Sequence, residues 1–320
     1  MSAAGPPQGA RAPLGGSAVR EATSVGAHFR VGIIGVGNMG GAMAQRLCSL
    51  GWAPWVHDVD ATKVQDLVLF GALAPVDIAQ AAIESVATIV CVVDAAQTRD
   101  VLFGAKGLAP HLPAGHVVLL CPTIAPQDVE SIAAQLAERG IQTIDAPMSG
   151  GPVRARDGSM SLMVAGEDAA VARVQTLLDA LSTKVFRISQ RVGDGARTKL
   201  VNNLLAGINL VGAAEVMALA GRMGLDLGRT LDVVEQSSGQ SWIGSDRMRR
   251  AIAGDLAPRA HMTLLAKDTR LAQEAAAHEG FVGPLGASAS AVFAAAVAAG
   301  LEGLDDGALL AFLQRPKMAE

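Results

Sequence analysis

VGIIGVGNMGGAMAQRLCSLG, the stretch from Val31 to Gly51, decides the fold of this chain. Its composition predicts a short β-strand, a glycine turn and a helix whose apolar residues recur at helical spacing. The turn consists of Gly35, Val36, Gly37, Asn38, Met39 and Gly40. A G-x-G-x-x-G turn that follows a strand and opens a helix is the fingerprint of dinucleotide binding. We therefore predict a dinucleotide site at this turn.

Each glycine of the turn has a separate task. Gly35 makes the tight turn, Gly37 lets a pyrophosphate approach the backbone, and Gly40 lets the helix pack closely on the strand. Backbone amides at the start of the helix then bind the phosphates. Asp58 in WVHDVD lies about 20 residues farther on, where an acid accepts hydrogen bonds from the adenosine ribose. No Arg directly follows Asp58 to bind a 2′-phosphate, so NAD is favoured and NADP stays open.

The chain then alternates between helix and strand patterns, which predicts a doubly wound parallel sheet, an α/β fold of the Rossmann type. Helices are expected near residues 62–69, 98–103, 126–139 and 168–181, and strands at 87–93, 117–121, 141–145, 159–166 and 184–188. From Gly193 to Phe312 the segments are Ala/Leu-rich with helical periodicity, so this part is expected to be all-helical. We predict residues 1–29 as a disordered leader, 30–192 as the dinucleotide-binding domain and 193–320 as a helical substrate and oligomerisation domain, joined through a long helix.

The predicted long helix begins the second part, in GDGARTKLVNNLLAGINLVGAAEVMALAGRMG from Gly193 to Gly224. Its polar residues interrupt what would have to be about 20 nearly continuous apolar residues in a membrane span, so it belongs in a protein core. Lys199 and Asn203 are four residues apart and share one face of the helix. A buried lysine is paired or functional, whereas one near a helix end also extends to solvent along its apolar stem. The helix alone leaves both interpretations open.

Composition limits the classes of function. The 320 residues are 50% hydrophobic and 3% aromatic, with a formal net charge of −4. This balance provides no basic surface for nucleic acid or anionic lipid. The leader has no apolar run typical of a signal peptide. Three cysteines and scattered histidines show no metal spacing. We expect a cytoplasmic protein without disulfide, metal, nucleic-acid or membrane partner.

Four stretches together resemble the β-hydroxyacid dehydrogenase family, over Val31 to about Phe312. They are GVGNMGGAMAQRL (Gly35–Leu47), DAPMSGGPVRARDGSMSLMVAG (Asp145–Gly166), GDGARTKLVNN (Gly193–Asn203) and LLAKDTRLA (Leu264–Ala272). The resemblance implies an NAD(P)-dependent oxidoreductase that transfers hydride between the cofactor and a small 3-hydroxy acid or semialdehyde. It also implies a homodimer or homotetramer.

The resemblance assigns roles residue by residue. The loop of Ser149, Gly150 and Gly151 holds the substrate carboxylate, Lys199 is the catalytic acid/base and Asn203 binds substrate beside it. Thr123 and Lys267 contact the cofactor, as does Val93 through its backbone. The chain departs from the family at Val93-Asp94 and Pro122-Thr123, where the family has Leu-Pro and Ser-Thr.

The substrate is not fixed by these motifs. Our specific expectation is 2-hydroxy-3-oxopropionate (tartronate semialdehyde) reductase, with 3-hydroxyisobutyrate and threonate-type dehydrogenases as alternatives. Trp242 lies in the predicted loop SSGQSWIGSDR (237–247), where it is either a substrate-pocket wall or a packing residue. A non-catalytic cofactor-binding module, an imine reductase and a 6-phosphogluconate dehydrogenase are less favoured. The first two would lack the lysine that Lys199 matches, and the third needs a much longer helical domain.

Overall fold

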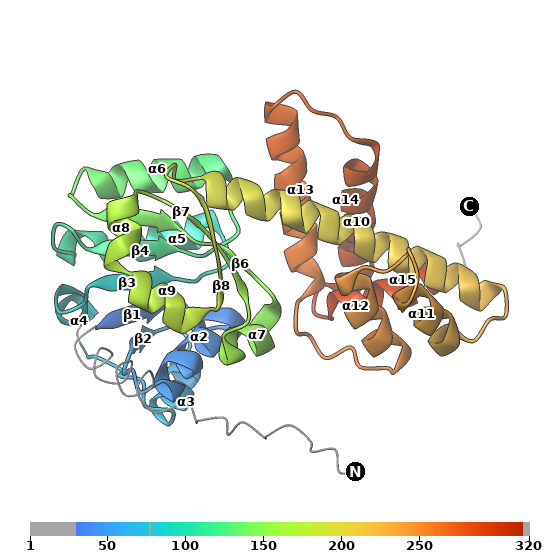
Figure 1. Ribbon diagram of the computed structural model, residues 1–320, viewed down its shortest axis with the longest axis horizontal. Helices are drawn as coiled ribbons and strands as arrows, with labels where there is room; N and C mark the ends of the chain where they lie inside the picture. The colour runs from blue at the N-terminus through green and yellow to red at the C-terminus, as the bar shows by residue number, and fades with distance from the viewer. Residues whose placement is uncertain (1–29, 77, 316–320) are drawn as a thin grey trace, which may run out of the picture.

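The computed structural model describes residues 30–76 and 78–315, so the predicted leader at residues 1–29 lies outside them. One sheet of eight strands fills the N-terminal half, and the C-terminal half is helical (Figure 1). The predicted Rossmann-type sheet followed by a helical part is confirmed. The two halves are joined by one long helix, α10 (Asp194–Arg222), as expected.

The strands run in the order β2-β1-β3-β4-β5-β7-β6. Strand β8 lies outside this order and pairs with β7. Strands β1 to β5 are parallel, β5 and β6 pair antiparallel with β7, and β8 is parallel to β7. Their bounds are β1 Val31–Ile34, β2 Trp55–His57, β3 Ala87–Val90, β4 Val117–Leu120, β5 Gln142–Asp145, β6 Met148–Ser149, β7 Ser161–Ala165 and β8 Lys184–Ser189.

Helices cover both faces of the sheet because its central strands are apolar on both sides. Strands β1, β3 and β4 are buried along their whole length. One core lies under α2 and α9, with Met43, Leu47 and Leu177, and the other lies under α5 and α6, with Leu102 and Ile132. The helices of this half are α2 Asn38–Ser49, α3 Ala61–Val68, α4 Ile78–Ile83, α5 Ala95–Phe103, η1 Ala109–His111, α6 Pro126–Ala137, α7 Gly151–Asp157, α8 Asp168–Arg173 and α9 Gln175–Leu181.

The helical half packs around α10, which crosses from the sheet to the far end of the molecule (Figure 1). Its core contains Leu210 and Met217 from α10 together with Met248 and Phe293. The other elements are α11 Leu227–Glu235, α12 Trp242–Ile252, α13 Met262–His278, α14 Pro284–Ala296, η2 Val297–Leu301, η3 Asp306–Ala308 and α15 Leu309–Gln314. Buried ion pairs of Arg250 and Arg247 with Asp305 and Asp306 tie α12 to the segment that precedes α15.

Several predicted boundaries were wrong. The expected helix over 168–181 is two helices, because the backbone at Val174 leaves helical geometry. The expected loop over 237–247 is shorter, because the Ser241 hydroxyl accepts a hydrogen bond from the Gly244 amide at 3.1 Å and starts α12 at Trp242. The strands predicted to end at Val93 and Cys121 end three residues and one residue earlier, at Val90 and Leu120.

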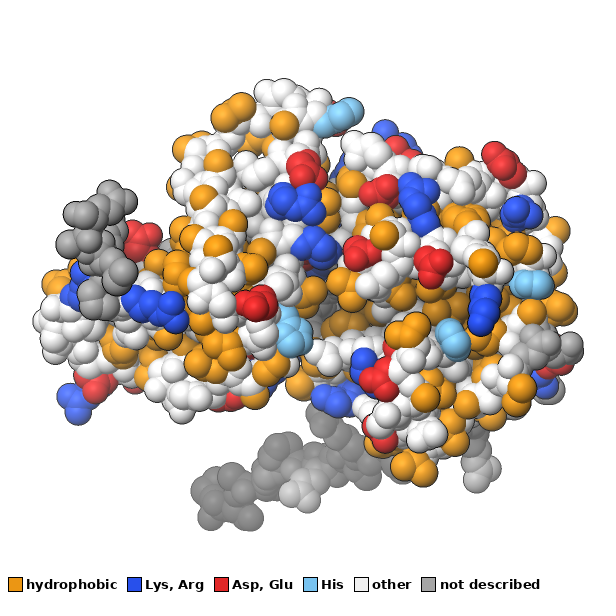
Figure 2. Space-filling model, turned by 180° about the vertical axis from the view of Figure 1, so that it is seen from behind, with side chains coloured by type: hydrophobic (Ala, Val, Ile, Leu, Met, Phe, Trp, Pro, Cys, Tyr) orange, Lys and Arg blue, Asp and Glu red, His pale blue; other side chains and the backbone are white. Residues whose placement is uncertain are grey.

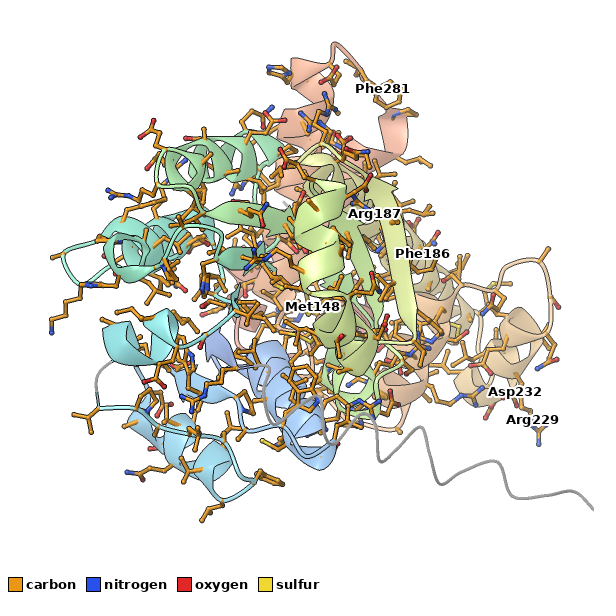
Figure 3. All side chains as sticks on the ribbon, turned by 60° about the vertical axis from the view of Figure 1, so that its left-hand side comes forward. Met148, Phe186, Arg187, Arg229, Asp232 and Phe281 are labelled. Carbon is orange, nitrogen blue, oxygen red and sulfur yellow. The ribbon has the colours of Figure 1, made fainter. Side chains whose placement is uncertain are left out.

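The short elements α4, η1, β6 and α7 of the sheet half were missed. They have two to seven residues, too few for a periodic pattern to emerge. Strand β8 was predicted correctly and lies at the edge of the sheet, where Phe186 is exposed and Arg187 pairs with Asp168 at 2.8 Å (Figure 3).

Candidate active site

The glycine turn joins β1 to α2 as the fingerprint predicts. Gly35 has a φ of 84°, a left-handed conformation that side chains disfavour. A Cβ on Gly40 would lie 1.9 Å from the Gly35 carbonyl oxygen, whereas a Cβ on Gly37 would meet nothing within 4 Å. The helix N-cap, Gly37, provides no capping side chain, and the first turn of α2 carries no acid. Open backbone at Gly37 and an uncapped helix N-terminus fit a pyrophosphate.

Asp58 directly follows β2, beside this turn. One of its carboxylate oxygens accepts a hydrogen bond from the Val36 amide at 2.8 Å, and the other accepts one from the Asp60 amide at 2.9 Å. These bonds fix the carboxylate next to the glycine turn. Each carboxylate oxygen keeps a second lone pair, which suits acceptance of ribose hydroxyls.

The remaining predicted cofactor residues lie at the same edge of the sheet. Val93 and Thr123 each lie three residues beyond the carboxyl end of a parallel strand, β3 and β4. Lys267 reaches this edge from α13, in the helical half, and its ammonium donates to the Thr123 carbonyl oxygen. Ligands of open α/β sheets bind at this edge. The structure therefore gathers the predicted cofactor residues, the Gly35–Gly40 turn, Asp58, Val93, Thr123 and Lys267, at one edge of the sheet.

Lys199 lies in the second turn of α10 and is buried. Burial lowers the pKa of Lys199 from 10.5 to about 8, while Asp268 acts to raise it and Lys267 acts to lower it. Among the residues that the structure describes, no hydrogen bond or ion pair involves the Lys199 ammonium. A buried amine whose pKa is near neutrality is suited to acid/base work.

Asn203 and Asp268 surround this lysine with fixed polar groups. The Asn203 side-chain amide donates to Asp268 Oδ2 at 2.6 Å and accepts a hydrogen bond from Asn202 at 3.0 Å. The other oxygen, Asp268 Oδ1, lies 2.9 Å from the Lys267 ammonium. Asp268 therefore links the predicted substrate residue Asn203 to the predicted cofactor residue Lys267. Asp268 was not predicted, although it directly follows Lys267 in one of the quoted stretches.

Asp145 was also not predicted, and it sets the position of α10. It ends β5, and its Oδ2 accepts hydrogen bonds from the amides of Gly193 at 3.0 Å and Ala196 at 2.8 Å. Burial raises the pKa of Asp145 to about 7, against the lowering effect of these backbone N–H groups. The Asp145 carboxylate therefore anchors the start of the helix that carries Lys199 to the end of β5.

The Ser149–Gly151 loop is strongly turned. Gly150 and Gly151 have φ values of 127° and 74°, so both occupy backbone conformations that favour glycine. Successive amides in such a turn form a concavity that binds anions. The helix that follows, α7, carries Arg154, whose guanidinium carbon lies 4.6 Å from the centre of the Trp242 ring. Trp242 therefore contacts the helix next to the loop, across from its own helix α12.

Cys48, Cys91 and Cys121 are free thiols. Within residues 30–76 and 78–315, no three or more His, Cys, Asp or Glu side chains are grouped to hold a metal ion.

Two family models and several dehydrogenases of known name match most of this chain. A family model described as the NAD binding domain of 6-phosphogluconate dehydrogenase matches residues 30–189. A second, described as NAD-binding of NADP-dependent 3-hydroxyisobutyrate dehydrogenase, matches residues 193–313. The chain is 38% identical to an L-threonate dehydrogenase of Escherichia coli over 286 residues, 89% of this chain and 95% of that protein. It is 35% identical to the L-threonate dehydrogenase of Cupriavidus necator over 280 residues, 88% of this chain and 94% of that protein.

A solved structure extends this similarity to the whole fold. The crystal structure of 3-hydroxyisobutyrate dehydrogenase from Salmonella typhimurium is 37% identical and superposes with a TM-score of 0.83. It covers 89% of this chain and 99% of its own length. These matches span the sheet, α10 and the helical half, and they agree with the four stretches that carry the resemblance. The chain therefore belongs to the β-hydroxyacid dehydrogenase family of NAD(P)-dependent oxidoreductases.

Proposed function

We propose that this protein is an NAD-dependent dehydrogenase of a four-carbon polyhydroxy acid of the threonate class, with Lys199 as its catalytic acid/base. The observation that carries the proposal is the buried side chain of Lys199, whose ammonium makes no hydrogen bond or ion pair among the described residues and feels the charges of Asp268 and Lys267, which are bonded to each other and to Asn203. Burying a cation without a partner costs free energy, and such a cost is typical of a functional group.

The cofactor, when bound, takes up a hydride in oxidation and gives one in reduction. The Gly35–Gly40 turn and Asp58 hold it, with Val93, Thr123 and Lys267 along the same edge. In oxidation, neutral Lys199 accepts the proton of the substrate hydroxyl as the C–H bond breaks. In reduction, the Lys199 ammonium donates that proton to the carbonyl oxygen, which gains negative charge as its carbon is reduced.

Substrate orientation comes from two further sets of residues. The carboxylate lies on the amides of the Ser149–Gly151 loop, helped by the Ser149 hydroxyl. Asn203, held by Asp268, hydrogen-bonds the reacting oxygen beside Lys199. Trp242 closes the pocket from α12. This arrangement fixes the reacting carbon between an anchored carboxylate and the acid/base, which lowers the entropic part of the barrier.

The substrate class rests on the relatives. L-threonate dehydrogenases match most of the chain at 35–38% identity. The family resemblance also implies a Ser-Trp pair in the matching loop of threonate-type enzymes, where this chain has Ser241-Trp242. The sequence-based expectation of 2-hydroxy-3-oxopropionate is not confirmed by these comparisons. It stays as the second candidate, because the carboxylate loop and Lys199 suit any small acid with a neighbouring hydroxyl or carbonyl.

A substrate panel tests this proposal. We expect L-threonate with NAD to give a higher kcat/KM than 3-hydroxyisobutyrate, and higher than 2-hydroxy-3-oxopropionate measured with NADH. The rates are followed by absorbance of NADH. A preference for 2-hydroxy-3-oxopropionate would instead support the second candidate, and no turnover of any panel member would contradict the proposed function.

We also propose that the chain forms a homo-oligomer through its helical half. The apolar helix α10 and the apolar segment from Pro284 to Leu301 are long enough to span a membrane, yet only 33% and 28% of their most apolar windows are buried. Apolar side chains extend over the helical half of the molecule (Figure 2). The large apolar side chains exposed there include Val201, Leu205, Val216 and Leu219 on α10, Met223 directly after it, Phe281 and Val282 before α14 and Leu285 within α14, with Phe281 at the tip between α13 and α14 (Figure 3). A second copy covers such a surface by closed symmetry.

Light scattering after gel filtration tests the oligomer. We expect the mass of two or four chains at micromolar concentration. Replacing Leu219 by Glu, which places a charge in the proposed interface, should shift the protein towards monomer. The matched control is Leu69→Glu, because Leu69 is exposed on the sheet half and 87% accessible. A monomeric wild-type protein, or a Leu219→Glu variant with unchanged mass, would contradict the interface.

A further inference from the structure

We propose that Arg154 is a specificity-determining residue whose guanidinium binds the hydroxyl-bearing end of a polyhydroxy acid. The inference rests on the proposed function and adds a residue that neither the fingerprint nor the family motifs assign. It starts from one contact, the guanidinium of Arg154 stacked over the ring of Trp242 at 4.6 Å. The two residues come from opposite halves of the molecule, α7 and α12.

The Arg154 guanidinium has unused hydrogen-bond donors. Arginine carries five N–H groups in a plane, and stacking on an aromatic ring occupies the face of that plane rather than its edge. Among the described residues, none accepts a hydrogen bond from this guanidinium. Asp157, one turn away on the same helix, attracts this guanidinium by its charge, but its carboxylate takes its hydrogen bond from the Ser159 amide at 2.8 Å. The edge of the guanidinium is therefore available to a ligand.

The stem of Arg154 begins at the carboxylate loop. A Cβ placed on Gly150 would lie 2.9 Å from Cδ and 3.1 Å from Cβ of Arg154, so the stem packs directly on Gly150. From there the side chain extends to Trp242 at the start of α12. Arg154 is partly buried along this path. The guanidinium thus lies between the loop that anchors the carboxylate and the wall contributed by the helical half.

Substrate chemistry then decides what the guanidinium binds. A small hydroxy acid has a carboxylate, a reacting carbon and a remaining end. The carboxylate lies on Ser149–Gly151 and the reacting carbon lies at Lys199. The remaining end faces Trp242 and Arg154. A bare tryptophan wall suits the methyl group of 3-hydroxyisobutyrate, whereas a guanidinium edge on that wall suits the hydroxyl oxygens of L-threonate. A site that hydrogen-bonds a substrate hydroxyl discriminates against the analogue that lacks it.

Kinetics of Arg154→Met with two acids test the assignment. We expect kcat/KM for L-threonate to fall about ten- to hundredfold, the range for losing hydrogen bonds to a charged group, and mainly through KM. For 3-hydroxyisobutyrate we expect kcat/KM to stay within about threefold, since its methyl makes no hydrogen bond. Arg154→Lys keeps the charge but loses the planar arrangement of N–H donors. Its kcat/KM for L-threonate should lie between the values of wild type and Arg154→Met.

Two controls separate recognition from structure. Arg156→Met removes the same charge from the same helix, but Arg156 is exposed and bonds to Gln45 at 3.5 Å, so both acids should behave as with wild type. A thermal-shift titration without turnover should show that L-threonate raises the Tm of wild type more than that of Arg154→Met. Equal losses for both acids, or no loss for either, would overturn the role of Arg154 while leaving the proposed function intact. Wild-type enzyme inactive on L-threonate would instead contradict the proposed function, and this inference with it.

Discussion

Replacing Lys199 by Ala is expected to lower kcat at least about a hundredfold, the range for losing a general acid/base. The interaction of Lys199 with substrate strengthens as charge develops on the reacting oxygen, so its loss acts on turnover more than on binding. Cofactor affinity should change little, because the groups that we propose to hold the cofactor lie mainly at the Gly35–Gly40 turn and Asp58. Steady-state kinetics and a separate NADH titration measure the two effects.

Two further variants of Lys199 sharpen this prediction. Lys199→Arg should lose turnover as well, because a guanidinium does not release its proton near neutral pH.

Lys199→Met should lose activity but gain stability at pH 7. A tenfold change in a protonation equilibrium corresponds to about 1.4 kcal/mol, so lowering the lysine pKa from 10.5 to about 8 costs about 3 kcal/mol of folding free energy below pH 8. That cost disappears as pH rises from 8 to 10.5. A Lys199→Met protein with a lower Tm at pH 7 would show that the amine stabilises the fold instead.

The second large effect is expected in the choice of cofactor. Asp58 is fixed by the amides of Val36 and Asp60, so its charge stays beside the ribose site. A 2′-phosphate would meet this carboxylate, and like-charge contact in a complex costs several kcal/mol. We expect kcat/KM with NAD to exceed that with NADP by about a hundredfold.

Asp58→Asn tests the cause of this preference. The amide removes the charge and keeps one acceptor, so the ratio of NAD to NADP use should fall by at least about tenfold. Asp60→Asn is the matched control, because Asp60 carries the same charge two residues away but caps α3 through the Thr62 amide at 3.0 Å. A wild-type preference for NADP would show that a cation elsewhere governs the selection. An equal change of the ratio in both variants would show that the charge of Asp58 is not its specific cause.

The sequence predicted the elements that have strong local patterns. The glycine turn with its strand and helix, the alternating sheet and the long α10 were predicted because apolar spacing and glycine positions are local properties. Boundaries at Val90, Leu120 and Val174 were not predicted. Strand ends depend on hydrogen bonds to neighbouring strands, and the break at Val174 depends on packing. A short stretch of sequence contains no information on either kind of contact.

The site was predicted unevenly for the same reason. Lys199 and Asn203 share a helix face, but this spacing alone left packing and function open, and the family resemblance assigned their roles. Asp145, Asp268 and Arg154 act through contacts 51, 65 and 88 positions away in the chain, with Ala196, Asn203 and Trp242 respectively. Single sequences hold no spacing signal for such pairs, because only the folded chain brings their side chains together.

The pH dependence of oxidation tests the role of Lys199 most directly. Asp268 and Lys267 are the charged groups that act on this amine, and burial holds its pKa at about 8. Only the neutral amine accepts the proton of the substrate hydroxyl, so kcat/KM with saturating NAD should rise about tenfold per pH unit below this pKa and level off above it. The residual activity of Lys199→Ala should lack that rise. A profile that is flat from pH 6 to about 9, or one that keeps the same rise in Lys199→Ala, would contradict Lys199 as the catalytic base.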